Sequence, residues 1–314
     1  MADPLLVLKI DVDTFRGTRE GVPSLVRMLQ QHGAHASFLF SLGPDHTGWA
    51  LRRALRPGFF QKVSRTSVVE HYGFKTLMYG VLLPGPDIGA RCAAEMKAAA
   101  AAGFECGVHT WDHVLWQDFV RHKSPAWTQR EMFKARERFA AVFGHAPRTH
   151  GAAGWQMNRA AFAEHDAAGY AYASDGRALL NEDGSLAQPD AGPYRIEGLS
   201  CVQLPTTLPT LDEVLGREIG GRTIDTDNVA DYLLELTQRQ KRDHVYTLHA
   251  ELEGQKLAPI FDRLLAGWKA QGYRLASMAD YHATLQDQPL PEFPVQWGQL
   301  PGRSGDLIVL DTTR

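Results

Sequence analysis

The sequence lacks the features of membrane-spanning, disulfide-stabilised and nucleic-acid-binding proteins. No apolar run in the 314 residues approaches the roughly 18 residues of a membrane span. The three cysteines are odd in number and widely spaced, which argues against a disulfide framework and fits a reducing compartment. A formal charge of −3 gives no general attraction to nucleic acid. The apolar run near the N-terminus is short and is broken by Lys9, so we expect no signal peptide and predict a cytoplasmic protein.

The chain also lacks internal repeats and low-complexity linkers, and instead alternates strand-like with helix-like segments. The strand-like runs are residues 5–10, 36–40, 104–108, 170–173, 201–204, 245–248 and 273–276. The helical patterns are residues 22–32, 88–102, 128–143, 158–168, 226–240 and 259–271, and several of them end at a glycine. This alternation predicts an α/β protein with a parallel sheet that closes into a barrel.

Two regions depart from the alternation. Residues 1–285 are predicted to form one barrel domain, whereas residues 286–314 are rich in proline and glycine and are expected to be a surface-bound or partly disordered tail. Residues 42–86 form an insertion in which Arg52, Arg53 and Arg56 alternate with large apolar side chains. Such a composition is typical of a segment that binds anionic headgroups at a membrane surface, and equally of a solvated helix face packed on a barrel.

The polar residues that end the strand-like runs form the most informative pattern. Asp11 and Asp13 end the first run, His109 and His113 follow the third, and His249 ends the run at 245–248. The C-terminal ends of parallel strands are where α/β enzymes place their chemistry. Two imidazoles and one carboxylate can hold a divalent metal with one face open, and the second carboxylate can then act as a base toward water. The set predicts metal-dependent hydrolysis.

Three other functions would use part of this pattern. A phosphatase of the haloacid dehalogenase type needs Asp-x-Asp-x-Thr, but here Thr14 comes one position early and Phe15 stands in the expected place. A glycosyltransferase could use Asp-x-Asp to hold a metal–nucleotide complex. Both interpretations leave the paired histidines without a role. A non-catalytic lipid-binding or metal-binding barrel needs neither a spare Asp11 nor His249.

Several motifs together resemble the polysaccharide deacetylase (NodB homology) family. They are Ile10–Pro23, His109–His113, Ala152–Trp155, Leu204–Thr210 and Tyr246–Glu251, and the resemblance covers roughly residues 5 to 285. It implies a distorted (β/α) barrel and a metal-dependent amidohydrolase. It also implies one divalent ion, which is zinc, manganese or cobalt.

The resemblance assigns roles residue by residue. Asp11 corresponds to the general base and His249 to the catalytic acid, while Asp13, His109 and His113 correspond to the metal ligands. Asp175 matches a later aspartate of the family and is expected to orient His249. The family usually has adjacent aspartates, whereas Val12 separates them here. Its Arg-x-Pro-x-Gly motif is missing; His150 stands four residues before Gly154, with Arg148 nearby, so the group that orients Asp11 is left open.

Within the family, the motifs are most similar to members that remove a formyl group from an amino sugar carried on a polyprenyl phosphate. That substrate is amphipathic and implies an enzyme attached peripherally to the inner membrane, with a role in lipid A modification and antibiotic resistance. Deacetylation of another N-acylated sugar is the alternative. The candidate substrate-binding residues are Arg16, Arg19, Arg52, Arg53, Arg56, Trp155 and Glu251.

Overall fold

A computed structural model describes residues 3–50, 74–285, 288–303 and 305–313 of the chain. Arg52, Arg53 and Arg56, on which the predicted membrane-facing insertion depends, lie outside the described residues. The flanks of that insertion are described, and they include the short helix α4 (Phe74–Met78).

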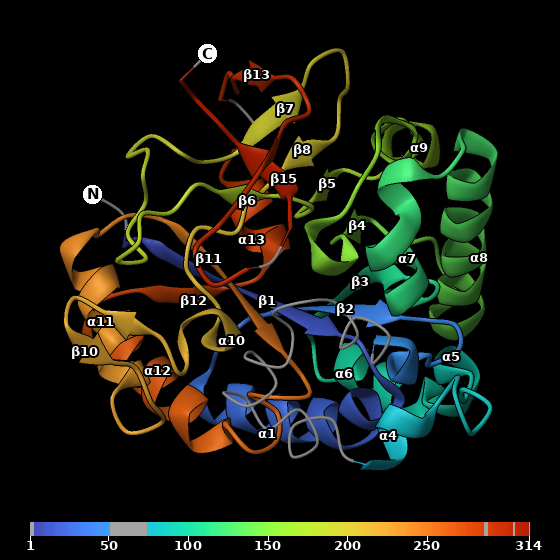
Figure 1. Ribbon diagram of the computed structural model, residues 1–314, viewed down its shortest axis with the longest axis horizontal. Coiled ribbons are helices and arrows are strands. Elements are labelled where there is room, and N and C mark those ends of the chain that lie inside the picture. Colours follow the sequence, from blue (N-terminus) through green and yellow to red (C-terminus); the bar gives the residue numbers. More distant parts are fainter. Residues whose placement is uncertain (1–2, 51–73, 286–287, 304, 314) are drawn as a thin grey trace.

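A curled, mostly parallel sheet forms the centre of the molecule (Figure 1). Its strand order is β11-β1-β2-β3-β4-β5-β8-β7-β13, and β12 pairs with β1. Pairing is parallel from β11 to β8, while β7 runs antiparallel to β8. The strands are β1 (Leu5–Val12), β2 (Ser37–Ser41), β3 (Glu105–Thr110), β4 (Thr149–His150), β5 (Tyr172–Ala173), β7 (Tyr194–Ile196), β8 (Val202–Gln203), β11 (His244–His249), β12 (Arg274–Ala276) and β13 (Glu292–Phe293). The predicted α/β class and distorted barrel are confirmed.

Helices cover the outer face of the sheet (Figure 1). The longer ones are α1 (Val22–His32), α6 (Ala93–Ala101), α8 (Pro125–Phe143), α9 (Arg159–Ala168), α11 (Val229–Arg239) and α12 (Ala258–Ala270). The glycines predicted to end α1, α8 and α9 do so in the left-handed conformation. The predicted helix at 88–102 is divided at Cys92, because α5 (Ile88–Arg91) ends there and α6 begins anew.

The remaining elements are short. They are η1 (Gly17–Gly21), α7 (His113–Phe119), η3 (Val120–His122), η4 (Ala153–Trp155), β6 (Arg177–Ala178), α10 (Leu211–Val214), β9 (Glu218–Ile219), β10 (Arg222–Thr223), α13 (Met278–Ala283), β14 (Trp297–Gly298) and β15 (Leu307–Leu310). Among the described residues no helix combines the length and the apolar character that crossing a membrane requires.

The two faces of β1 divide the core in two. Because side chains alternate along a strand, Leu6, Leu8 and Ile10 pack into the large cluster beneath the outer helices. Leu5 and Val7 pack instead into a smaller cluster with Leu39, Tyr172 and Val202. That smaller cluster lies on the inner face, and Lys9, Asp11 and Asp13 continue the same face toward the C-terminal end of the strand. The sequence thus places three charged side chains inside the curl of the sheet.

The C-terminal residues form part of this fold. We expected residues 286–314 to be surface-bound or partly disordered, but β13 pairs with β7, and β15 is buried and pairs with β6. Leu307–Leu310 is a continuous apolar run, which packs against Trp155 and the core beside it. The expected loose tail is corrected accordingly, while the division of the chain at residue 285 stays a prediction.

Candidate active site

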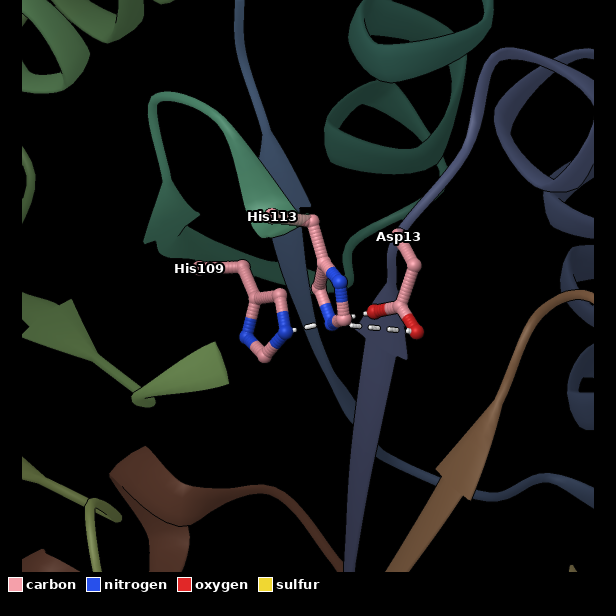
Figure 2. Close-up of side chains that lie close together, drawn as sticks. All are labelled: Asp13, His109 and His113. Carbon is pink, nitrogen blue, oxygen red and sulfur yellow. Dashed lines mark ion pairs between the residues drawn. The ribbon is translucent and has the colours of Figure 1, made fainter. Parts of the chain in front are cut away.

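Asp13, His109 and His113 converge at the C-terminal ends of β1 and β3 (Figure 2). Their ligand atoms all lie within 4.8 Å of one another. Asp13 Oδ1 is 3.2 Å from His109 Nε2, and Asp13 Oδ2 is 3.4 Å from His113 Nε2. The two histidines do not share a helical face, because His109 belongs to β3 whereas His113 opens α7 behind the N-cap Asp112. A strand end and a helix start thus provide the paired ligands.

The chemistry of these donor atoms fits a cation. His109 Nδ1 donates a hydrogen bond to the carbonyl oxygen of Gly151 at 2.6 Å, so its Nε2 presents a lone pair to Asp13. When His109 is neutral, this nitrogen and the carboxylate oxygen, 3.2 Å apart, repel each other unless a cation, either a proton or a metal ion, lies between them. His113 is 20% exposed while His109 is 1% exposed, so the cluster has one accessible side. An open site with two imidazoles and a carboxylate is typical of catalytic metal centres.

Charge within the cluster favours the ionised carboxylate. Burial raises the pKa of Asp13, but His113 and His109 outweigh burial and hold the pKa well below its ordinary value. Glu251 fixes the backbone at Asp13 and Thr14, because its Oε1 accepts hydrogen bonds from both amides and from the Thr14 hydroxyl. Burial, assisted by Asp13, raises the pKa of Glu251 to about 8. Glu251 therefore positions the loop that follows β1.

Asp11 is paired with a lysine of its own strand. Lys9 Nζ lies 3.2 Å from Asp11 Oδ2, and both side chains are nearly inaccessible. The other oxygen, Asp11 Oδ1, is 3.7 Å from His109 Nδ1. Gly151 makes room for the lysine, since a Cβ there would lie 2.8 Å from Lys9 Cε. Lys9 was missed as a site residue; its signal was its position two residues before Asp11, on the same face of the strand.

His249 faces the same centre from the end of β11. The register of the sheet pairs Asp11 with His249 across neighbouring strands. His249 Nδ1 lies 4.0 Å from Asp212 Oδ1, and the His249 amide donates to Glu253 Oε2 at 3.0 Å. Burial lowers the pKa of His249, but Asp212 and Asp13 outweigh it and raise the pKa above its ordinary value. The structure thus brings the predicted base, the predicted ligands and the predicted acid together.

Both the sequence and the fold are similar to those of known proteins. The sequence profile of the polysaccharide deacetylase family matches residues 4–173. A curated protein from Shewanella sediminis, named "Probable 4-deoxy-4-formamido-L-arabinose-phosphoundecaprenol deformylase ArnD", is 36% identical over 91% of this chain and 88% of its own. The chain belongs to the polysaccharide deacetylase family. It is accordingly a hydrolase that acts on an amide bond.

Other proteins are similar to this chain in sequence or in fold. A protein of the same name from Wigglesworthia glossinidia brevipalpis is 29% identical, covering 92% of this chain and 96% of its own. A solved structure named "Crystal structure of putative polysaccharide deacetylase from Mycobacterium smegmatis" superimposes with a TM-score of 0.62 at 15% identity, covering 96% of this chain and 97% of its own. The structure of PuuE allantoinase superimposes with a TM-score of 0.56 at 13% identity, covering 90% of this chain and 91% of its own. These two structures establish the shared fold.

The family aspartate Asp175 has different partners from those expected. Asp175 Oδ1 accepts a hydrogen bond from His150 Nδ1 at 2.7 Å, and Oδ2 accepts one from Gln203 Nε2 at 3.1 Å. His165 Nδ1 lies 3.4 Å from Oδ2. Among the described residues, the carboxylate that pairs with the His249 ring is that of Asp212, at 4.0 Å from Nδ1, so the expectation that Asp175 orients His249 is corrected. The reason is that β4, β5 and β8 enclose Asp175 in a sealed cluster of their own.

The remaining candidates occupy the surroundings of the site. Trp155, predicted to bind substrate, is 1% exposed, and its ring centroid lies 4.5 Å from the guanidinium carbons of both Arg177 and Arg303. A buried indole in this position braces two arginines. Arg16 forms an ion pair with Glu20, and Arg19 is exposed beside the Phe15 ring. Both arginines follow Asp13 closely in the sequence: Arg16 directly precedes η1, and Arg19 belongs to it. Their predicted contact with substrate phosphate stays a prediction.

Proposed function

We propose that this protein hydrolyses the formamide group of 4-deoxy-4-formamido-L-arabinose carried on undecaprenyl phosphate, releasing formate and the free 4-amino sugar. The observation that carries the proposal is the convergence of Asp11, the Asp13–His109–His113 cluster and His249 in an amide hydrolase fold. The substrate is taken from the names of the two curated relatives, which match most of this chain. The product would bear an ammonium group, which is the chemical purpose of such a step in lipid A modification.

Asp13, His109 and His113 would hold one zinc, manganese or cobalt ion. When bound, such an ion supplies the Lewis acidity that makes a water reactive at neutral pH and polarises a carbonyl oxygen. The ligands suit all three metals, since imidazole and carboxylate groups bind each of them.

The base and the acid would act on opposite sides of the scissile bond. Asp11 accepts the proton of the attacking water, and Lys9 beside it holds the carboxylate in place. His249, whose pKa is raised by neighbouring carboxylates, donates its proton to the amine nitrogen as the C–N bond breaks. An amide nitrogen leaves poorly without that proton, so both residues are needed.

The enzyme would meet its lipid substrate at the surface of the inner membrane, from the cytoplasmic side. The sequence of the insertion supports this proposal, because Arg52, Arg53 and Arg56 lie among large apolar residues. Arg16 and Arg19 are the candidates closest to the metal ligands for binding the substrate phosphate.

The decisive experiment is formate release from the formamido-arabinose lipid, measured with metal content on the same samples. We expect about one metal per chain in the wild type, with release of formate and little or no acetate from the N-acetyl analogue. Bound metal without formate release would retain the amidohydrolase and exclude this substrate, and preferential acetate release would favour a sugar deacetylase. A protein that neither binds metal nor releases either acid contradicts the proposal.

Membrane attachment is tested separately. Replacing Arg52, Arg53 and Arg56 with glutamate should release the protein from vesicles that contain anionic lipid, with metal content unchanged. A matched control replaces Arg222, Arg239 and Arg263 with glutamate; these three arginines are 43%, 57% and 52% exposed. The control carries the same change in charge and should stay bound. Vesicle binding that survives the first triple substitution would exclude the role of the insertion.

A further inference from the structure

The C-terminal segment, residues 288–303 and 305–313, inserts an arginine beside the candidate active site. Arg303 Nε donates to Glu213 Oε1 at 2.7 Å, and Arg303 Nη2 lies 3.6 Å from Asp212 Oδ2. Asp212 and Glu213 are consecutive residues of α10, whose sequence is far from residue 303. One guanidinium group therefore binds both carboxylates of this short helix, and its side chain is only 19% exposed.

Asp212 connects Arg303 to His249. Its Oδ2 faces Arg303, whereas its Oδ1 lies 4.0 Å from His249 Nδ1 and accepts a hydrogen bond from the Thr210 hydroxyl at 2.6 Å. Burial raises the pKa of Asp212, but Arg303 and then His249 hold the pKa below its ordinary value. Within the described part of the chain, the buried Nδ1 of His249 has no hydrogen-bond partner. Asp212 is thus an ionised group poised at the ring of the predicted acid.

The surroundings fix Arg303 in this position. Its guanidinium lies over the Trp155 ring, and Arg177, which also packs on that ring, donates to both oxygens of Glu213. Arg177 and Arg303 together hold the pKa of Glu213 at about 2 despite burial, so the carboxylate stays charged. Gly302 has φ of +85°, and a Cβ there would lie 2.3 Å from the carbonyl oxygen of Glu213. Only glycine lets the backbone approach α10 so closely.

We propose that the C-terminal segment completes the active site, with Arg303 as a positioning residue that holds Asp212 and, through it, His249. The inference rests on the proposed role of His249 as the acid that protonates the leaving amine. An imidazole protonates a leaving nitrogen efficiently only when its ring is held in the right orientation, and a carboxylate at Nδ1 provides that orientation. Arg303 pairs with Asp212 and not with the predicted base Asp11 or the predicted acid His249, so it acts by restricting the conformation of the Asp212 side chain.

The first test separates turnover from binding. In Arg303→Met, kcat for the formamide should fall about tenfold, a part of the 10²–10⁴ that general acid–base catalysis contributes, while KM stays within about twofold. Metal content should be unchanged, and Arg303→Lys should recover part of kcat because it restores the charge. The matched control is Arg121→Met. Arg121 pairs with Asp306 of the same segment at 2.9 Å and packs on Trp297, without contact to α10. It should retain wild-type kcat.

The second test uses the leaving group. 4-Nitrophenyl acetate releases a phenolate that needs no proton, so its hydrolysis depends on the metal side of the site and little on the acid. Arg303→Met should therefore lose amide hydrolysis and keep most of its ester hydrolysis. An equal loss on both substrates, an equal loss in Arg121→Met, or a higher KM with unchanged kcat would each overturn the inference.

Failure of the proposed function gives a different result. A wild-type protein that releases no formate from the formamido sugar lipid excludes that substrate, whatever Arg303 does. The same amide-to-ester comparison on an N-acetylglucosamine oligomer then decides the role of Arg303. Equal sensitivity of the amide and the ester to Arg303→Met would overturn the inference there as well.

Discussion

The described part of the chain contains two clusters of two histidines and one aspartate, and they differ in what surrounds them. Asp13, His109 and His113 lie within 4.8 Å of one another, and so do the ligand atoms of His150, His165 and Asp175. In the first cluster His109 turns a lone pair toward the carboxylate, and His113 is partly accessible. In the second, His150 and Gln203 donate hydrogen bonds to the carboxylate, and all three members are buried. The same residue types thus form an open candidate metal centre and a sealed hydrogen-bonded network.

The difference shows that composition and proximity do not suffice to identify a metal site. What distinguishes the two clusters is whether hydrogen-bond donors already satisfy the carboxylate and whether an ion has access. Asp13 Oδ1 has no hydrogen-bond partner among the described residues, whereas both oxygens of Asp175 have one. We therefore propose the first cluster as the metal centre and a structural role for the second.

The largest expected effect comes from breaking the open cluster. His109→Ala should remove the bound metal and lower formate release by roughly three orders of magnitude, because several kcal/mol of transition-state stabilisation depend on the ion. The melting temperature without metal should change little. Elemental analysis and a formate assay measure both effects. His165→Ala is the matched substitution in the sealed cluster and should keep its metal; loss of metal in that variant would reverse our assignment of the two clusters.

Lys9 tests the charge beside the open cluster. Lys9→Met should lower kcat roughly tenfold to hundredfold, because Asp11, the proposed base, loses the cation that positions it. Metal content should be retained, and Lys9→Arg should keep more activity than Lys9→Met. Lys97→Met, at an exposed position on α6, serves as the control for removing a lysine. Wild-type turnover in Lys9→Met would show that Asp11 needs no partner.

Breaking the sealed cluster should cost stability. Asp175→Asn removes the charge that faces His150 and His165, and disrupting the buried hydrogen bonds of a charged group costs about 3 kcal/mol. Urea unfolding should show the lower free energy, while the remaining folded protein keeps its metal. A variant with unchanged stability and no metal would mean that the second cluster is the metal centre.

The smallest effect is a dependence of stability on pH. Burial outweighs the attraction of Asp175 and lowers the pKa of His165 to about 4, whereas an unfolded histidine titrates near 6.5. Between these values the unfolded state binds the extra proton, so stability is present above pH 6.5 and is lost as the pH falls toward 4. From pH 7 to pH 5 this amounts to about 2 kcal/mol.

Urea unfolding at pH 7 and pH 5 measures this slope. His165→Asn should flatten it, although His244, whose pKa burial also lowers to about 4, contributes a similar slope that should remain. If His165→Asn shows the full wild-type slope, His165 is already protonated in the folded protein, which would contradict a neutral histidine in the sealed cluster.

The sequence predicts the part of the site that strand ends provide. Asp11, Asp13, His109 and His249 each end a recognisable apolar run, and parallel pairing brings such ends to one edge of the sheet. The alternation of strands and helices likewise predicts the class of fold, since the glycine signals end α1, α8 and α9 as expected. These features are local in sequence and follow from periodicity and caps.

The remaining part depends on contacts between distant segments. The sequence shows Lys9 two positions before Asp11, yet its pairing with Asp11 inside the sheet depends on the space that Gly151 leaves for its side chain. Asp212 and Arg303 meet because residues 288–303 and 305–310 fold back on α10 and Trp155. A proline-rich and glycine-rich composition indicates a loose tail, and it does not reveal that Leu307–Leu310 is buried. Asp175 matched a family motif, but its partners come from β4, α9 and β8 and could not be inferred from the motif.

The pairing of β1 with β11 has a consequence for how the protein is made. Asp13 and Glu251, which share a hydrogen bond, are 238 residues apart, and β11 is the partner of β1 along most of its length. During synthesis at roughly 5–20 residues per second, β1 therefore waits more than ten seconds for this neighbour. The candidate metal ligands all emerge within the first 113 residues, long before His249 and Arg303. A nascent chain can thus assemble its ligands early, yet it becomes a complete catalyst only when its last residues arrive.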